Sequence, residues 1–163
     1  MNAEILKEVV TDILRNIPYR PFLCLPLSAT LYAILKDNYN IDARFVTGDL
    51  SYKGGYIFKQ DFKISDAKDN TYQDWEGHAW VEIGDLICDL SFFRTLYSDK
   101  FTKPFKQELI ARFGEGKGCL IATQTQMNLS GLSYCPIDYL SDDQATGIIK
   151  GFDSLLKTSD KQD

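Results

Sequence analysis

The sequence predicts an α+β fold in which N-terminal helices pack on a small antiparallel sheet. Three observations predict it: helical spacing of apolar residues near the start, two strand-length apolar runs at 78–83 and 86–90, and an amphipathic segment that begins at Ser141. The chain has 163 residues and is 44% hydrophobic, enough for one domain with a sizeable core. We therefore expect a single domain over 1–156 and a flexible tail at 157–163.

Two helices are expected before the first strand. Residues 3–17 carry isoleucine or valine every four residues, and the prolines that follow end this helix. A second apolar stripe comes next. Proline is tolerated in the first turn of a helix but not in its interior, so Pro26 predicts a helix that begins at about Cys24 or Leu25.

The rest of the chain alternates between strands and short helices. Strands are expected at 41–46, 56–58, 78–83, 86–90 and 119–123, and helices at 106–113 and from Ser141 onward. Ser141 should cap the last helix over Gln144. The polar segment 51–74 is expected to form a loop over a cleft.

Composition excludes several classes of function. The net charge of −5 argues against a nucleic-acid partner, which usually requires a basic face. No apolar run reaches the length of a membrane span, and the N-terminus does not resemble a signal peptide, so we expect no membrane partner and a cytoplasmic location. The four cysteines form no CxxC pair and the chain has one histidine, so neither a metal site nor a cofactor is expected.

The single histidine, His78, lies in the first strand of a predicted hairpin. A two-residue turn after Ile83 pairs Val81 with Cys88. This register directs an apolar set of side chains, Cys88 among them, into the core. It places His78 and Asp89 on the other face as diagonal neighbours, about 7–8 Å apart at the backbone. An imidazole and a carboxylate can meet across that distance.

Cys24 is the candidate nucleophile. A helix N-terminus favours a thiolate and offers N–H groups that can hold an oxyanion. Cys119 is expected in an apolar strand and Cys135 in a loop, and neither has a helix start behind it. Cys24 would attack a carbonyl, His78 would accept its proton, and Asp89 would orient the imidazole.

Other acids lie near His78 in the sequence, namely Asp74, Glu76 and Glu82. Asp89 is preferred because it interrupts an apolar run, where a carboxylate without a partner would be costly. Trp75 and Trp80 are candidates for the walls of a substrate cleft, although a core or surface position is equally compatible with each.

Four segments together resemble the transglutaminase-like core of the papain-like superfamily. They are Cys24 at a helix start, Ile41-Asp42-Ala43-Arg44-Phe45-Val46, His78-Ala79-Trp80-Val81-Glu82, and Cys88-Asp89-Leu90-Ser91. The family usually has glycine two residues before the cysteine, where this chain has Phe22. The resemblance implies a papain-like fold and a triad of Cys24, His78 and Asp89.

The resemblance also indicates the reaction. We expect a thiol-dependent amide hydrolase, a cysteine peptidase that acts on a peptide or acyl substrate through a thioester. Two alternatives stay open. The same thioester serves an acyltransferase that passes the acyl group to an amine or a thiol. In the other alternative, the chain is an inactive binding module of the same fold, in which Cys24 only fills the core.

Overall fold

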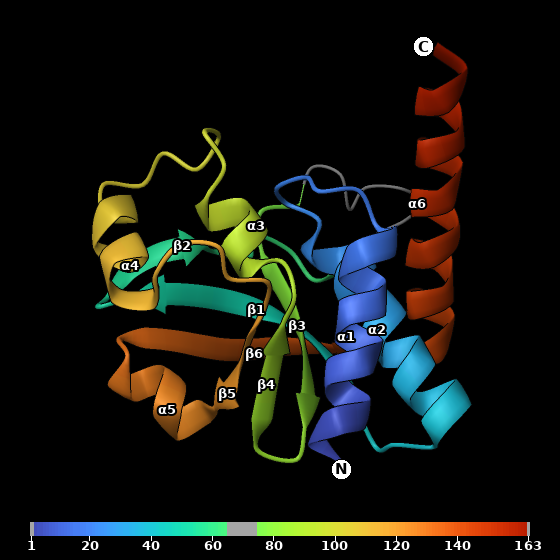
Figure 1. Ribbon diagram of the computed structural model, residues 1–163, viewed down its shortest axis with the longest axis horizontal. Helices are drawn as coiled ribbons and strands as arrows, with labels where there is room; N and C mark the ends of the chain where they lie inside the picture. The colour runs from blue at the N-terminus through green and yellow to red at the C-terminus, as the bar shows by residue number, and fades with distance from the viewer. Residues whose placement is uncertain (1, 65–74, 163) are drawn as a thin grey trace.

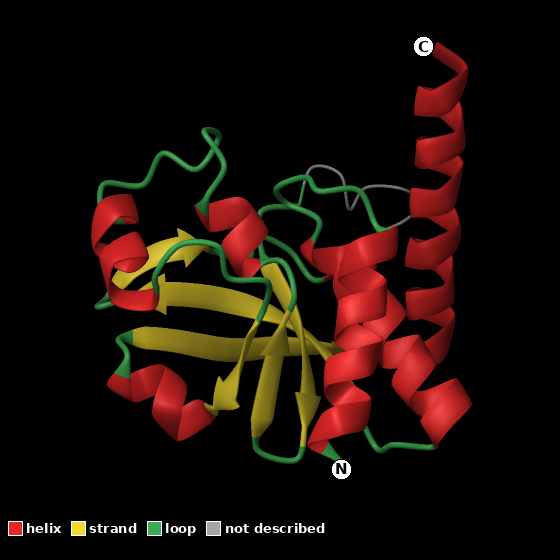
Figure 2. Cartoon of the chain, in the orientation of Figure 1, coloured by secondary structure: helices red, strands yellow, loops and turns green. Residues whose placement is uncertain are grey.

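The computed structural model describes residues 2–64 and 75–162, with side chains described up to residue 157. It is an α+β fold in which helices pack against a curled antiparallel sheet that forms a half-barrel (Figures 1 and 2). The helices are α1 (Ala3–Asn16), α2 (Cys24–Tyr39), α3 (Phe92–Leu96), α4 (Lys106–Phe113), α5 (Gln124–Leu129) and α6 (Asp142–Gln162). The strands are β1 (Arg44–Tyr52), β2 (Gly55–Phe58), β3 (His78–Ile83), β4 (Leu86–Asp89), β5 (Leu120–Thr123) and β6 (Leu132–Leu140).

The sheet is built around the long strand β1. One edge of β1 pairs with β6 from Phe45 to Tyr52. Its other edge is shared, because β3 pairs with its first half and β2 with its last residues. From β3 the sheet continues through β4 to β5. This arrangement brings the start of β3 and the end of β2 together, and His78 lies at that junction.

Both faces of the sheet are covered. Helices α1, α2 and α6 pack on one face, and the short helices α3, α4 and α5 contribute to a second core on the other face. Among the helices in the described part of the chain, none combines the length and apolar character needed to cross a bilayer.

The predicted helix starts are confirmed. Helix α2 begins at Cys24, with Pro26 in its first turn, and ends where Asn40 adopts a left-handed φ of 51°. Ser141 accepts a hydrogen bond from the Gln144 backbone at 3.2 Å, and the Gln144 side chain bonds back to the Ser141 N–H. Helix α6 continues to Gln162, through most of the segment expected as a flexible tail at 157–163. The tail and the single-domain boundary stay predictions.

The predicted hairpin register is also confirmed. Val81 pairs with Cys88 and Ile83 with Leu86, around a turn in which Gly84 has a φ of 58°. Val81 and Cys88 point into the core under α2, as expected. The opposite face is equally buried, because Trp80 and its neighbours pack against the short helices of the second core.

The interpretation of the segment around Cys135 as a loop was wrong. This cysteine lies in β6, the partner of β1 along nearly its whole length. Pro136 argued against a strand because proline cannot donate to a ladder. The structure accommodates it at an irregularity in the β1–β6 register, opposite Gly48. The expected strand 41–46 begins at Arg44 and runs on to Tyr52, so part of the loop expected at 51–74 is strand, and residues 65–74 lie outside the described residues.

Candidate active site

Three elements place Cys24, His78 and Asp89 in one part of the molecule. Cys24 is the first residue of α2, His78 is the first residue of β3, and Asp89 is the last residue of β4. Helix α2 packs directly on β3 (Figure 1). Cys24 and His78 both line a cavity of about 660 Å³, within the range of about 300–1,000 Å³ typical of ligand sites.

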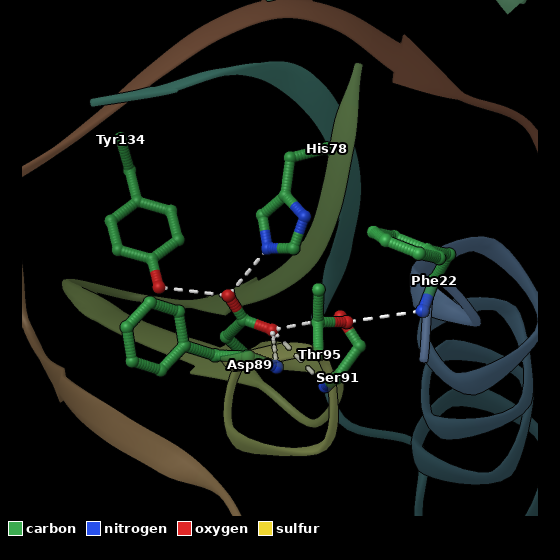
Figure 3. A network of polar contacts seen from close by, with 7 residues as sticks. Phe22, His78, Asp89, Ser91, Thr95 and Tyr134 are labelled. Carbon is green, nitrogen blue, oxygen red and sulfur yellow. Dashed lines mark hydrogen bonds and ion pairs between the residues drawn. The ribbon is translucent and has the colours of Figure 1, made fainter. Parts of the chain in front are cut away.

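His78 and Asp89 form a buried pair. Nε2 of His78 lies 2.5 Å from Oδ2 of Asp89, and both side chains are 0% exposed (Figure 3). Tyr134 donates its hydroxyl proton to the same Oδ2 at 2.8 Å. The other oxygen, Oδ1, accepts hydrogen bonds from the Ser91 N–H at 3.1 Å, the Ser91 hydroxyl at 3.3 Å and the Phe92 N–H at 3.0 Å. Both carboxylate oxygens are therefore fully satisfied, which fixes their position.

The second imidazole nitrogen of His78 is left for Cys24. Nδ1 is buried and has no hydrogen-bond partner among the described residues. Burial lowers the pKa of His78, but the charge and hydrogen bond of Asp89 outweigh it, and the Cys24 thiol acts in the same direction as Asp89, so the pKa is raised to about 10. His78 is therefore an imidazolium at neutral pH, with one N–H toward Asp89 and the other on the side of Cys24.

Aromatic rings hold the imidazole in place. The Phe58 ring stacks on His78 with 4.7 Å between centroids and 5° between planes. Trp80 and Tyr134 lie 6.2 Å from it on tilted planes. Trp80 is 0% exposed and does not line the cavity, so the structure does not bring it to the cleft that the sequence suggested.

Trp75, the other predicted wall residue, does line the cavity. Its indole N–H donates to the Phe62 carbonyl at 3.0 Å. The ring packs directly over Gly77, where a Cβ atom would lie 2.3 Å from the indole. A residue with any side chain at position 77 would push Trp75 out of its place beside His78.

The loop before Cys24 is fastened by α3, the helix that follows Asp89. The Thr95 hydroxyl oxygen accepts a hydrogen bond from the Phe22 N–H at 3.0 Å (Figure 3). Arg94 is 5% exposed and donates to the carbonyls of Ile17 and Pro18, both at 3.1 Å. One short helix therefore connects the loop before Cys24 to the carboxylate of Asp89.

Free backbone N–H groups lie at the N-terminus of α2, where Cys24 is the first residue. The first helical hydrogen bond runs from the Leu27 N–H to the Leu23 carbonyl at 3.1 Å. The N–H groups of Cys24 and Leu25 precede it and have no partner within the helix, and Pro26 has no N–H. These donors can hold the oxyanion that forms when a thiol adds to a carbonyl.

The other candidate acids and cysteines do not share the surroundings of Asp89 and Cys24 in the described part of the chain. Glu82 forms an ion pair with Arg44 at 3.1 Å, Glu76 is exposed at the cavity rim, and Asp74 lies outside the described residues. Burial raises the pKa of Cys88 to about 12, and it also raises that of Cys119. In the described part of the chain no cluster of three His, Cys, Asp or Glu side chains could hold a metal ion.

Sequence reasoning missed Tyr134, which completes the carboxylate site. It was missed because the segment around Cys135 was expected to be a loop, which gave Tyr134 no place on a face of the sheet. The alternation of Leu132 and Tyr134 was the available signal, since both are buried on the same face of β6.

Comparison of the chain with protein-family models, with curated proteins and with solved structures gives no match. The geometry of the site therefore carries the functional argument.

Proposed function

We propose that this protein is a thiol-dependent amide hydrolase, a cysteine peptidase with a papain-like fold of the transglutaminase-like type. The observation that carries the proposal is the buried His78–Asp89 pair: Nδ1 of His78 has no hydrogen-bond partner among the described residues, and His78 lines the same cavity as Cys24. A structural role for a buried histidine would leave neither nitrogen unsatisfied, because an unpaired buried polar atom is costly.

The reaction follows from the arrangement of Cys24, His78 and Asp89. Sγ of Cys24 attacks the substrate carbonyl as a thiolate beside the imidazolium N–H at Nδ1 of His78, while the N–H groups of Cys24 and Leu25 hold the oxyanion. The intermediate collapses to a thioester as the C–N bond breaks, and Nδ1 gives its proton to the departing amine. A water molecule then adds to the thioester, with His78 as base, and the acid product leaves as the thiol is restored.

Asp89 is a positioning residue in this scheme. It contacts Nε2 and so leaves Nδ1 to face the sulfur. It also stabilises the imidazolium that persists until the amine leaves. Tyr134 and the backbone donors after Asp89 prevent the carboxylate from turning away.

Trapping of the acyl-enzyme tests the proposal. The protein is mixed with p-nitrophenyl hexanoate, an activated acyl donor, and p-nitrophenolate release is followed while intact mass and peptide mapping locate the acyl group. We expect a burst of nitrophenolate and one hexanoyl group on Cys24. Cys24→Ala should abolish both, whereas Cys135→Ala, which removes an exposed cysteine on β6, should change neither. Acylation spread over the other cysteines, or none at all, would favour the inactive binding module.

A further inference from the structure

The charges around the cavity have the opposite sign to the charge of the whole chain. The protein carries 23 acidic and 18 basic residues, for a net charge of −5. Among the described residues, those that line the cavity include three cations, Arg20, Lys59 and Lys103, and one acid, Glu76. All four are exposed, so they lie at the rim of the cavity, where a bound substrate would meet solvent.

The three cations come from separate parts of the fold. Arg20 belongs to the loop before α2, Lys59 follows β2, and Lys103 lies between α3 and α4. Within the described ranges, neither Arg20 nor Lys103 has an acidic partner within 4.0 Å, and Lys59 lies over the Tyr56 ring at 5.2 Å. Their charges are therefore available to a ligand.

The interior of the cavity is apolar and aromatic. Its walls include Phe22, Ile57 and Trp75 on the side of His78, and Phe152 and Leu155 from α6. Leu155 is 42% exposed, although it is large and apolar. An apolar side chain that entered here would bury these surfaces against itself, which is a favourable process.

Resting on the proposed function, we propose that the preferred substrate is an acidic peptide segment: an apolar or aromatic residue enters the cavity with its carbonyl at Cys24, and a neighbouring carboxylate of the same peptide meets Arg20, Lys59 and Lys103. Apolar burial supplies the affinity. The cationic rim supplies the discrimination, since charges at the edge of a site chiefly select between partners.

Three matched esters test the preference. They are the p-nitrophenyl esters of acetyl-glutamyl-phenylalanine, acetyl-glutaminyl-phenylalanine and acetyl-lysyl-phenylalanine. The first two differ beside the phenylalanine in charge at nearly the same shape, and the third places a positive charge there. In each case Sγ of Cys24 forms the new S–C bond, and the C–O bond breaks to release nitrophenolate. We expect kcat/KM for the glutamyl ester to exceed that for the glutaminyl ester roughly tenfold, because three exposed ion pairs act together. At high salt the two values of kcat/KM should become nearly equal, since salt screens exposed charges. The lysyl ester should react most slowly.

Variants then locate the source of the preference. In the triple variant Arg20→Gln/Lys59→Gln/Lys103→Gln the ratio of glutamyl to glutaminyl kcat/KM should fall close to one. Lys100→Gln, which removes an exposed lysine outside the cavity, should retain the wild-type ratio. Equal constants for the two esters in the wild type, or a preference that survives in the triple variant, would overturn the inference while the proposed function stands. Failure of every ester to acylate Cys24 would overturn both.

Discussion

At the residue scale, the arrangement of one imidazole decides what the site can do. Asp89 occupies Nε2 of His78, and four further donors to the carboxylate keep it in place. An imidazolium held in this way presents one defined N–H, at Nδ1, on its free side. The raised pKa of His78 is the consequence that can be measured most directly, because the chain contains no other histidine.

Replacing Asp89 should reverse the direction of that pKa shift. In Asp89→Asn the attraction of the carboxylate is gone while burial remains, so the pKa of His78 should fall to 6.5 or lower. The imidazole signals of the single histidine, followed by NMR against pH, report this directly. The wild type should stay protonated through pH 8, and so should Asp85→Asn, which changes an exposed acid in the hairpin turn. A wild-type histidine that titrated near 6.5 would contradict the account.

Phe22 carries backbone strain two residues before Cys24. Its φ is 63°, in the left-handed region that favours glycine, and its ring packs edge-on against Phe58 at 6.4 Å. Phe22→Ala removes the ring and keeps the strain, whereas Phe22→Gly removes both. We therefore expect the glycine variant to be the more stable of the two by about 1 kcal/mol, measured by urea unfolding. An alanine variant as stable as the glycine variant would show that this backbone is not strained.

At the element scale, the site depends on the termini of two neighbouring strands, β3 and β4, and on the first residues of two helices, α2 and α3. Strand β4 ends at Asp89, and α3 follows at once and holds the loop that leads to Cys24. Strand β6 contributes Tyr134 and pairs with β1, whose Gly48 lies directly opposite His78. The close approach of β6 to Gly48 is therefore part of what positions the imidazole.

Gly48→Ala should disrupt this approach. The new Cβ atom would lie 1.9 Å from the Cys135 carbonyl oxygen, a backbone atom that cannot move without displacing β6. We expect a loss of about 3 kcal/mol in the free energy of unfolding. Gly147→Ala, in α6 with open space around its Cβ, should instead gain about 0.5–1 kcal/mol from helix propensity. Thermal unfolding of the two variants and the wild type measures these changes in stability. A Gly48→Ala protein as stable as the wild type would contradict the close contact between Gly48 and β6.

The signals that determine each helix and strand explain which parts of the structure could be predicted from the sequence. Local signals were sufficient for the start of α2 and for the β3–β4 register, since a proline position and a two-residue turn determine each of them. These two features alone are enough to identify Cys24, His78 and Asp89 as candidate site residues. Tyr134 and the partnership of β6 with β1 depend on contacts distant in the sequence and on a register irregularity that accommodates Pro136. The alternation of Leu132 and Tyr134 is a local signal for a strand, but no local pattern encodes the pairing of that strand with β1 or the contact of Tyr134 with Asp89.

At the scale of the whole molecule, the buried pair links stability to pH. The pKa of His78 is about 10 in the folded protein and 6.5 when the chain is unfolded, so the pair stabilises fully below pH 6.5 and its contribution is lost as pH rises toward 10. Between pH 6 and 8 the unfolded chain releases this proton and the folded protein keeps it. In Cys24→Ala, where no thiol at position 24 titrates alongside His78, the free energy of unfolding should therefore fall by up to about 2 kcal/mol over that interval.

Urea unfolding at a series of pH values measures this slope. In the Cys24→Ala background, Asp89→Asn should lose the slope, whereas Asp85→Asn should keep it. A Cys24→Ala protein whose free energy of unfolding rises from pH 6 to 8 would show that His78 is buried in its neutral form.

The central claim is that Cys24 is a nucleophile activated by His78, and the rate of its alkylation by iodoacetamide against pH tests it most directly. Mass spectrometry reads each of the four cysteines separately, so exposed Cys135 serves as the internal reference. We predict fast labelling of Cys24 below neutral pH in the wild type, and in His78→Ala labelling that rises only near the free-thiol pKa of about 8.5. Labelling of wild-type Cys24 only near that pH, unchanged by the substitution, would contradict the account.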